Sequence, residues 1–333
     1  MVATISTVPT RESLLKQLEA HDFAVHEQYG NLYSLETTIQ GNETERVVPY
    51  FMFYDSARGV HLFFTRARKT DDMPETILSF ISATRDISNL WIAPSLMHSL
   101  TQEFESLFHE EFHMSYFTAV RNANTHIKAE RRPDFDRTIQ YTGADAKITL
   151  REFEYLYGVY PKIIEVQIGL SSGFRIDGQG ILTIRPGSTV PVFRALDMIV
   201  KEVMPIAEAV LTSRYEKRAI GGIERWIQHP FSIEMPTGVR SNLEQNFLAE
   251  VSNDYWQFIP ILPYVEEEIP YLSGRFLDGL KSSLFDVEIT RNRARVYPVE
   301  KMDIGTALRF CQFMSQSEDI HSTVGIVSER GSA

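Results

Sequence analysis

A local pattern recurs three times along this chain and restricts the folds open to it. Each repeat has two short segments in which apolar and polar residues alternate, followed within a few residues by an amphipathic helix. Strands joined by a tight hairpin lie antiparallel, so the pattern predicts an α+β fold with antiparallel sheets. The hairpins are expected at 47–65, 163–185 and 284–299, and the helices near 74–85, 190–212 and 303–316.

The last third of the chain gives the clearest order of elements. It predicts β-α-β-β-α-β, the order of a ferredoxin-like sandwich, in which two helices cover one face of an antiparallel sheet. The expected strands are Tyr255–Leu262, Leu284–Thr290, Ala294–Val299 and His321–Val327, and the expected helices are Tyr264–Ser283 and Ile304–Met314.

The middle third repeats this order, and the N-terminal part follows it less closely. In the middle third, Gly178 suits the first central position of a two-residue type II′ turn. The N-terminal part is expected to contain four strands between residues 23 and 65, with Val48–Tyr54 buried on both faces, and a long helix that continues through Phe117. The fold predicted for the whole chain is therefore a series of ferredoxin-like (βαββαβ) modules with antiparallel sheets, preceded by an α+β N-terminal domain.

Two interruptions divide the chain into three predicted domains. Residues 122–137 are polar and charged and contain Pro133, and Gly221-Gly222 follows the long helix near 190–212. The domains are expected at 1–125, 126–221 and 222–333, where the middle and last are ferredoxin-like modules.

Composition limits the binding partners and the cellular compartment that can be expected for this protein. The net charge of −11 gives no overall attraction for polyanions, so nucleic acid would need a local basic patch. The single cysteine, Cys311, cannot form an intramolecular disulfide and suits a reducing compartment. Neither a signal peptide nor an apolar stretch of about 18 residues is found, so we expect a cytoplasmic protein.

One segment matches a catalytic pattern. His109, Glu110 and His113 form an HExxH sequence, which on a helix would place two zinc ligands on one face with Glu110 as the general base. The charged neighbours Glu103, Glu105 and Glu111 favour a solvated helix instead. A third ligand is also needed, and His126 and Asp134 lack a recognisable spacing. A zinc-dependent hydrolase is therefore kept as an alternative, and no cofactor is predicted.

A second pattern, GxSxG at 169–173, resembles a nucleophile elbow, but a strand follows where the elbow requires a helix. The candidate binding residues are instead arginines. Lys128, Arg131, Arg132 and Arg137 form a basic linker that Arg175, Arg185 and Asp145 could join around a cleft. In the last hairpin, Arg293 and Arg295 share a sheet face with Glu288, which should lie opposite Arg295 as an ion pair.

These features predict a non-catalytic cytoplasmic binding or regulatory protein. It would engage a protein partner or an anionic small ligand through clefts between modules and through sheet faces. Besides the zinc hydrolase, a nucleic-acid-binding protein that uses the basic linker remains an alternative. Free sheet edges also predict a homodimer.

Overall fold

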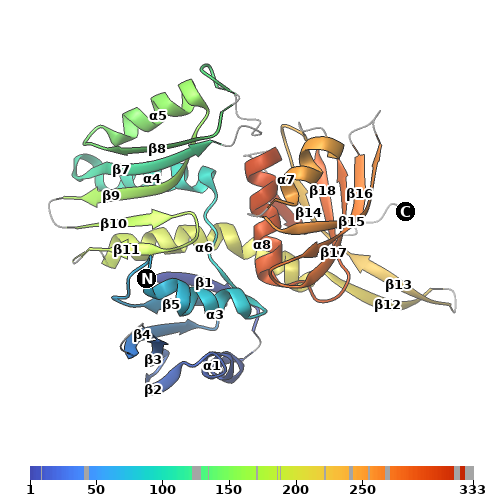
Figure 1. Ribbon diagram of the computed structural model, residues 1–333, viewed down its shortest axis with the longest axis horizontal. Helices are drawn as coiled ribbons and strands as arrows, with labels where there is room; N and C mark the ends of the chain where they lie inside the picture. Colours follow the sequence, from blue (N-terminus) through green and yellow to red (C-terminus); the bar gives the residue numbers. More distant parts are fainter. Residues whose placement is uncertain are drawn as a thin grey trace.

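The computed structural model describes residues 1–8, 10–40, 45–121, 129–133, 135–169, 172–185, 187, 189–220, 223–239, 243–253, 256–266, 271–318 and 323–326. The fold is α+β, with three larger antiparallel sheets and one two-stranded ribbon. We name the parts built on the three larger sheets the N-terminal, middle and C-terminal units. The N-terminal and middle units lie one above the other on the left of Figure 1, and the C-terminal unit lies to their right.

The N-terminal sheet has six strands in the order β2-β3-β4-β5-β1-β6. One face packs on α1 (Arg11–Glu19) and α3 (Ile77–Ala83), through a core that includes Leu14, Leu18 and Phe80. Thr10 caps α1 by accepting a hydrogen bond from the Ser13 backbone N–H. The strands are β1 (Val2–Ser6), β2 (Ala24–Tyr29), β3 (Leu32–Gln40), β4 (Glu45–Asp55), β5 (Val60–Phe64) and β6 (Ile87–Asn89), and a short helix, α2 (Asp72–Glu75), precedes α3.

Strand β4 corrects one expectation. Its buried and exposed residues alternate, with Tyr50 and Met52 in the core while Val47 and Phe51 are 55% and 49% exposed. The prediction that Val48–Tyr54 is buried on both faces was therefore wrong. An unbroken apolar run does not distinguish a strand that is covered on both faces from a strand whose apolar residues are exposed on one face.

The middle sheet has the order β11-β10-β9-β7-β8. Strand β7 lies before the predicted domain boundary at 125/126, yet it pairs with both β8 and β9. Helices α4 and α5 pack on β7 and bury Phe104 and Phe117, while Phe153 on α5 is partly buried against Phe117. The elements are α4 (Pro94–Phe108), β7 (Phe112–Arg121), β8 (Arg137–Thr142), α5 (Ala146–Tyr157), β9 (Tyr160–Ile168), β10 (Ser172–Asp177) and β11 (Leu182–Ile184).

The turn between β10 and β11 differs from the expected type II′ turn. Gly180, not Gly178, has a positive φ of 73°. The Asp177 carboxylate stabilises the turn by accepting hydrogen bonds from the N–H groups of Gln179 (2.9 Å) and Ile181 (3.1 Å). The Asp177 carboxylate, which precedes both glycines, therefore favours a turn of more than two residues. The prediction of a two-residue turn was wrong.

The C-terminal sheet has the order β15-β16-β17-β18-β14-β19. The predicted helix Tyr264–Ser283 was wrong, because this segment holds the end of β15 and all of β16. Leu272 and Phe276 are four residues apart, which suits one helix face, but strand alternation also turns both toward the core. The elements are β14 (Phe231–Glu234), α7 (Leu248–Val251), β15 (Phe258–Glu266), β16 (Tyr271–Asp278), β17 (Ser283–Thr290), β18 (Arg293–Pro298), α8 (Ile304–Phe313) and β19 (Thr323–Ile326).

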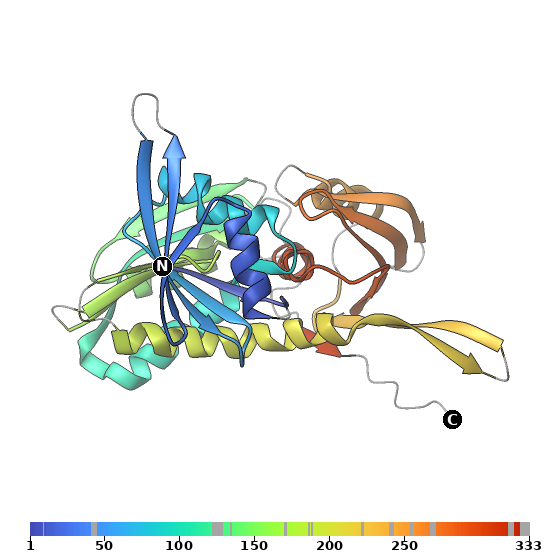
Figure 2. The same cartoon turned by 90° about the horizontal axis from the view of Figure 1, so that it is seen from below.

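The strand orders do not confirm ferredoxin-like modules. In the middle unit, β8 and β9 flank β7, and the long helix α6 (Thr189–Thr212) does not lead back into the same sheet. It leads to the separate ribbon of β12 (Arg214–Ile220) and β13 (Ile223–His229), which projects beyond the C-terminal unit in Figure 2. The coarser prediction of an α+β fold with antiparallel sheets is confirmed.

One continuous apolar core joins the three units. It contains Leu62 from the N-terminal unit, Val166 from the middle unit and Phe285 from the C-terminal unit, with α6 residues such as Ile199 between them. Helix α6 contacts α4, α8 and β19. Among the described residues, no helix combines the length and apolar character needed to cross a membrane.

Candidate functional site

The HExxH segment does not form a zinc-binding helix. Helix α4 ends at Phe108, a short 3-10 turn covers His109–Glu111, and β7 starts at Phe112, so the predicted helix through Phe117 was wrong. His109 has a positive φ of 47°, and this ends the helix. From Phe112 onward the apolar residues alternate toward the core, and this strand pattern overrides the helical one.

The two histidines therefore lie on different elements. The His113 ring nitrogen Nε2 lies 2.8 Å from Gln167 Oε1 on the neighbouring strand β9, so its partner is an amide. Among the described residues there is no cluster of three potential metal ligands. His126, Lys128 and Asp134 lie outside the described residues.

The basic linker and Asp145 lie at opposite ends of α5. The Arg131 backbone N–H donates to the Leu156 carbonyl at the C-terminal end of α5, and the Arg137 guanidinium lies 4.7 Å from the centre of the Tyr157 ring. Asp145 occupies the N-cap position of the same helix and accepts a hydrogen bond from Tyr141. Twelve helical residues span roughly 18 Å, so these groups do not form one cleft.

Arg132 belongs to the same end of the helix. Its carbonyl oxygen accepts a hydrogen bond from Arg137 Nη2 (3.2 Å), so the linker arginines Arg131, Arg132 and Arg137 form a cluster of their own.

Arg175 and Arg185 come together on the open face of the middle sheet. Both bind the carboxylate of Glu165 on β9, with Arg175 Nη2 2.7 Å from Oε2 and Arg185 Nη2 2.5 Å from Oε1. The Arg175 guanidinium also lies 4.4 Å from the centre of the Tyr116 ring. Glu165 is largely buried while both arginines are half exposed, so one carboxylate holds two cations at the surface.

The predicted ion pair on the C-terminal sheet is confirmed. Glu288 lies opposite Arg295 in the register of β17 and β18, with Arg295 Nη1 3.2 Å from Glu288 Oε2. Arg293 binds Glu234 on β14, with a distance of 2.6 Å between Nε and Oε1. Arg293 and Arg295 are therefore each paired with a carboxylate, so this face has little unpaired positive charge with which to bind an anion.

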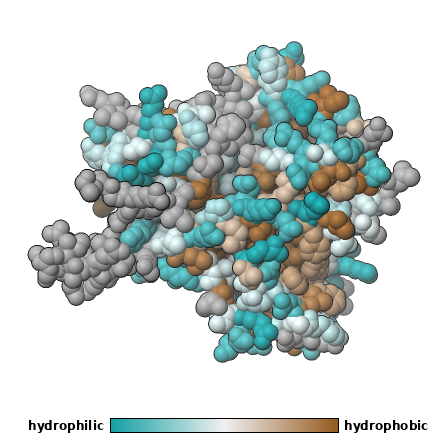
Figure 3. Space-filling model, turned by 180° about the vertical axis from the view of Figure 1, so that it is seen from behind, coloured by the Kyte–Doolittle hydropathy of each residue, from teal (hydrophilic) through white to brown (hydrophobic). Residues whose placement is uncertain are grey.

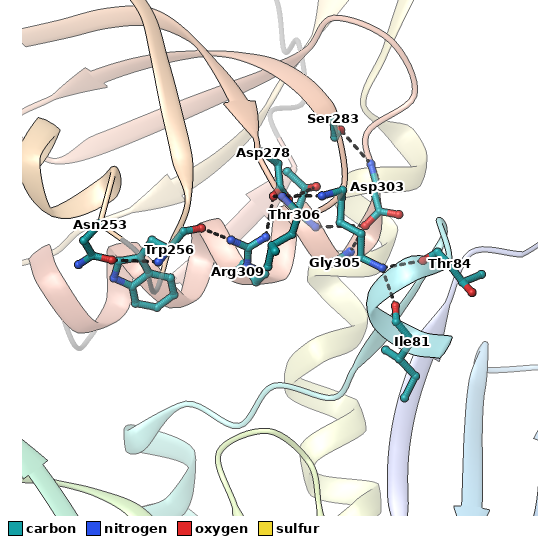
Figure 4. A network of polar contacts seen from close by, with 12 residues as sticks. Ile81, Thr84, Asn253, Trp256, Asp278, Ser283, Asp303, Gly305, Thr306 and Arg309 are labelled. Carbon is teal, nitrogen blue, oxygen red and sulfur yellow. Dashed lines mark hydrogen bonds and ion pairs between the residues drawn. The ribbon is translucent and has the colours of Figure 1, made fainter. Parts of the chain in front are cut away.

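A buried polar cluster lies where the C-terminal unit meets the N-terminal unit (Figure 4). Lys281 donates to the carbonyl oxygens of Ile81 (2.6 Å), Thr84 (2.6 Å) and Ile87 (3.3 Å). These carbonyls end α3 or belong to β6, so a lysine 200 residues away satisfies groups that the helix leaves without partners.

Two buried aspartates complete this cluster. Asp278 accepts hydrogen bonds from Thr306 (2.6 Å) and Arg309 (2.6 Å), and Asp303 caps α8 through the Gly305 N–H (2.8 Å). Burial lowers the pKa of Lys281 and raises the pKa of Asp303, although their attraction opposes both shifts. Because these groups satisfy one another, we assign the cluster to the joining of the units.

A groove runs between the N-terminal unit and the edge strand β11. We call it the β11 groove; its volume is about 580 Å³, within the range of roughly 300–1,000 Å³ typical of small-molecule sites. It is walled by the segment after β5, by β11 and by the first turns of α6. Its apolar lining includes Phe64, Met73, Leu182, Ile184, Val192 and Phe193.

Two cationic side chains line the same groove, together with Met1, whose N-terminal amine donates a hydrogen bond to the Leu182 carbonyl oxygen (2.8 Å). Lys69 binds the largely buried carboxylate of Asp177, at the end of β10. Arg66 makes no ion pair with any residue that the structure describes. Thr183 lies directly across from Arg175 in the register of β10 and β11, so the groove adjoins the pair of arginines held by Glu165.

Sequence reasoning identified Arg175 and Arg185 but missed the groove. Its residues come from segments near 64–73, 181–184 and 189–193, and no motif connects them. The signals present in the sequence were Arg66 and Lys69 directly after an apolar strand.

Comparison with known proteins finds a match to a family model over part of the chain and one similar protein. Residues 95–179 match a family model described as "AF_0896_M: family middle domain", and this segment runs from α4 to the β10–β11 turn. A protein of Archaeoglobus fulgidus described as "Uncharacterized protein" is 27% identical over 329 residues, which cover 96% of this chain and 88% of that protein. Neither description names an activity, a ligand or a partner.

Proposed function

We propose that the protein is a non-catalytic cytoplasmic binding or regulatory protein that holds a small anionic ligand in the β11 groove. The observation that carries the proposal is Arg66, a cation without an ion-pair partner among the described residues, in a groove of about 580 Å³. In a chain with a net charge of −11, an unneutralised arginine in a concave site favours binding of a negative group.

The neighbouring charges support the same ligand class. Four positive side chains lie on or beside β10 and β11, namely Arg66, Lys69, Arg175 and Arg185. Glu165 binds Arg175 and Arg185, and Asp177 binds Lys69. Four positive and two negative side chains leave a local excess of positive charge. The described residues that line the groove include hydroxyls and cations but no histidine or carboxylate to act as a general base, which supports binding rather than catalysis.

Replacing Arg66 with glutamate tests the proposal. Isothermal titration of the wild-type protein with citrate should give saturable binding, and Arg66→Glu should weaken it at least about tenfold, since a repulsive charge replaces an attractive one. The matched control is Arg68→Glu, two residues along, because Arg68 is 74% exposed, pairs with Asp71 and does not line the groove. Equal weakening in both variants, or binding of neither citrate nor a monocarboxylate by the wild-type protein, would contradict the proposal.

A homodimer remains a second proposal and rests on β15. This edge strand exposes Ile259, Ile261 and Leu262, the last with 90% of its surface accessible. Pro260 and Pro263 interrupt its row of backbone donors, so association would use these side chains rather than continuous strand pairing. Light scattering of the wild-type protein and Leu262→Lys tests it, and a wild-type monomer at all concentrations would count against it.

A further inference from the structure

We infer that the ligand of the β11 groove is an amphipathic anion, a monocarboxylate with an extended apolar chain, whose carboxylate binds Arg66 and whose chain lies on Phe64, Ile184 and Phe193. The inference rests on the proposed function and specifies its ligand class. Most of the groove lining is apolar, and its free cation lies in the segment Phe64–Lys69 that forms one wall.

The apolar wall includes side chains that are exposed to solvent. Phe193 is 44% exposed and Ile184 is 36% exposed, while Val192 and Leu182 beside them are buried in the core. Phe64 lies directly across from the exposed Phe51 in the register of β4 and β5, which extends the apolar surface. In Figure 3, hydrophobic residues are interspersed with hydrophilic ones over the right-hand half of the molecule, where the N-terminal and middle units lie. Covering such a surface with an apolar chain is favourable in water.

The positive charge that lines the groove matches a ligand with one carboxylate better than it matches a polyphosphate. Lys69 is already paired with Asp177, and burial lowers the pKa of the Met1 amine to about 6, which leaves Arg66 as the unpaired cationic side chain among the described lining residues. A nucleotide or diphosphate carries several negative charges and would need more cations or a helix N-terminus directed at it. A single guanidinium can bind a single carboxylate through two parallel hydrogen bonds.

The test is isothermal titration with acetate, octanoate and decanoate below their micelle concentrations. If the chain is buried, each added methylene raises the affinity by roughly threefold to fourfold, so decanoate should bind about tenfold more tightly than octanoate. Phe193→Ser should remove most of this dependence on chain length. Val190→Ser is the matched control, because Val190 lies one helical turn away on α6, is 66% exposed and does not line the groove.

The outcomes separate this inference from the proposed function. If citrate binds through Arg66 but acetate and decanoate bind equally, the amphipathic ligand is wrong and the anion site stands. If decanoate binds equally well to Phe193→Ser and Val190→Ser, it binds elsewhere and the inference is overturned. If neither citrate nor decanoate binds to a wild-type protein with a cooperative unfolding transition, both proposals fail.

Discussion

A hydrogen bond of 2.6 Å joins the ammonium group of Lys281 to the carbonyl oxygen of Ile81, 200 residues earlier in the chain. Lys281 belongs to the C-terminal unit, and Ile81 lies in the last turn of α3 in the N-terminal unit. The same ammonium group binds two further carbonyls of that unit, so its position fixes how the two units meet. The contacts of Lys281 should therefore contribute more to the free energy of unfolding than the contacts of an exposed lysine.

Replacing Lys281 with methionine should destabilise the protein strongly. The variant leaves Asp303 without the buried cation that attracts it and leaves three carbonyls without their donor, so we expect a loss of about 3–5 kcal/mol in the free energy of unfolding. Urea denaturation measures it. Lys301→Met is the control, because Lys301 pairs with Asp86 while 59% exposed and should cost less than about 1 kcal/mol. Similar losses in both variants would show that the buried contacts contribute little.

Stability should fall in mild acid because of His61. Burial lowers the pKa of His61 from 6.5 to about 4, and its ring stacks on Tyr54 with the centroids 4.8 Å apart. As the pH falls from 6.5 toward 4, the unfolded chain binds a proton that the folded protein does not, which removes up to about 3 kcal/mol of stability in this window. His61→Phe keeps the stacked ring and should flatten the dependence of unfolding free energy on pH.

The control for this effect is His26→Gln, because the His26 ring is half exposed beside Glu36. Urea denaturation at several pH values should give the wild-type slope in this variant. An unchanged slope in His61→Phe would assign the acid sensitivity to other groups.

The β10–β11 turn should tolerate alanine at one glycine and not at the other. Gly180 has a φ of 73°, and an added Cβ would overlap the Leu90 carbonyl oxygen, so Gly180→Ala should cost roughly 2–4 kcal/mol. In Gly178→Ala the new Cβ would lie 3.6 Å from its nearest neighbour, the Ile92 carbonyl oxygen, so we expect less than about 1 kcal/mol. Thermal and urea unfolding compare the two, and a more damaging change at Gly178 would contradict the observed turn.

Removal of the His113 side chain should have a small effect. Its ring nitrogen has an amide partner, Gln167, so His113→Ala should cost about 1 kcal/mol through the lost hydrogen bond. A chelator should not change the melting temperature of either protein. Near-stoichiometric zinc in the wild-type protein that disappears in His113→Ala would instead support the hydrolase alternative.

The sequence predicted those parts of the fold that depend on neighbouring residues. The hairpin of β17 and β18, the helix α8 and the Glu288–Arg295 pair were predicted because alternation and spacing act over a few residues. The strand Tyr271–Asp278 was not, since Leu272 and Phe276 suit either a helix or a strand and only the neighbouring strands decide between them.

The candidate site depends on contacts that are distant in sequence, and less of it could be predicted. Arg175 and Arg185 were identified as arginines of the hairpin 163–185, but their shared partner Glu165, ten residues before Arg175 in the same hairpin, was not. The β11 groove forms only when Phe64 and Phe193, more than a hundred residues apart, come to line the same space beside β11. Its anion-binding role remains a prediction.

Helix α6 begins beside the groove and reaches the C-terminal unit, and its 24 residues span about 36 Å. Pro205 lies inside it and cannot donate a backbone hydrogen bond to the carbonyl of Lys201, so the helix bends more easily there than elsewhere. We therefore expect that any displacement of the first turns of α6 would be taken up by bending at Pro205. Such bending would leave the strands of the C-terminal sheet in place.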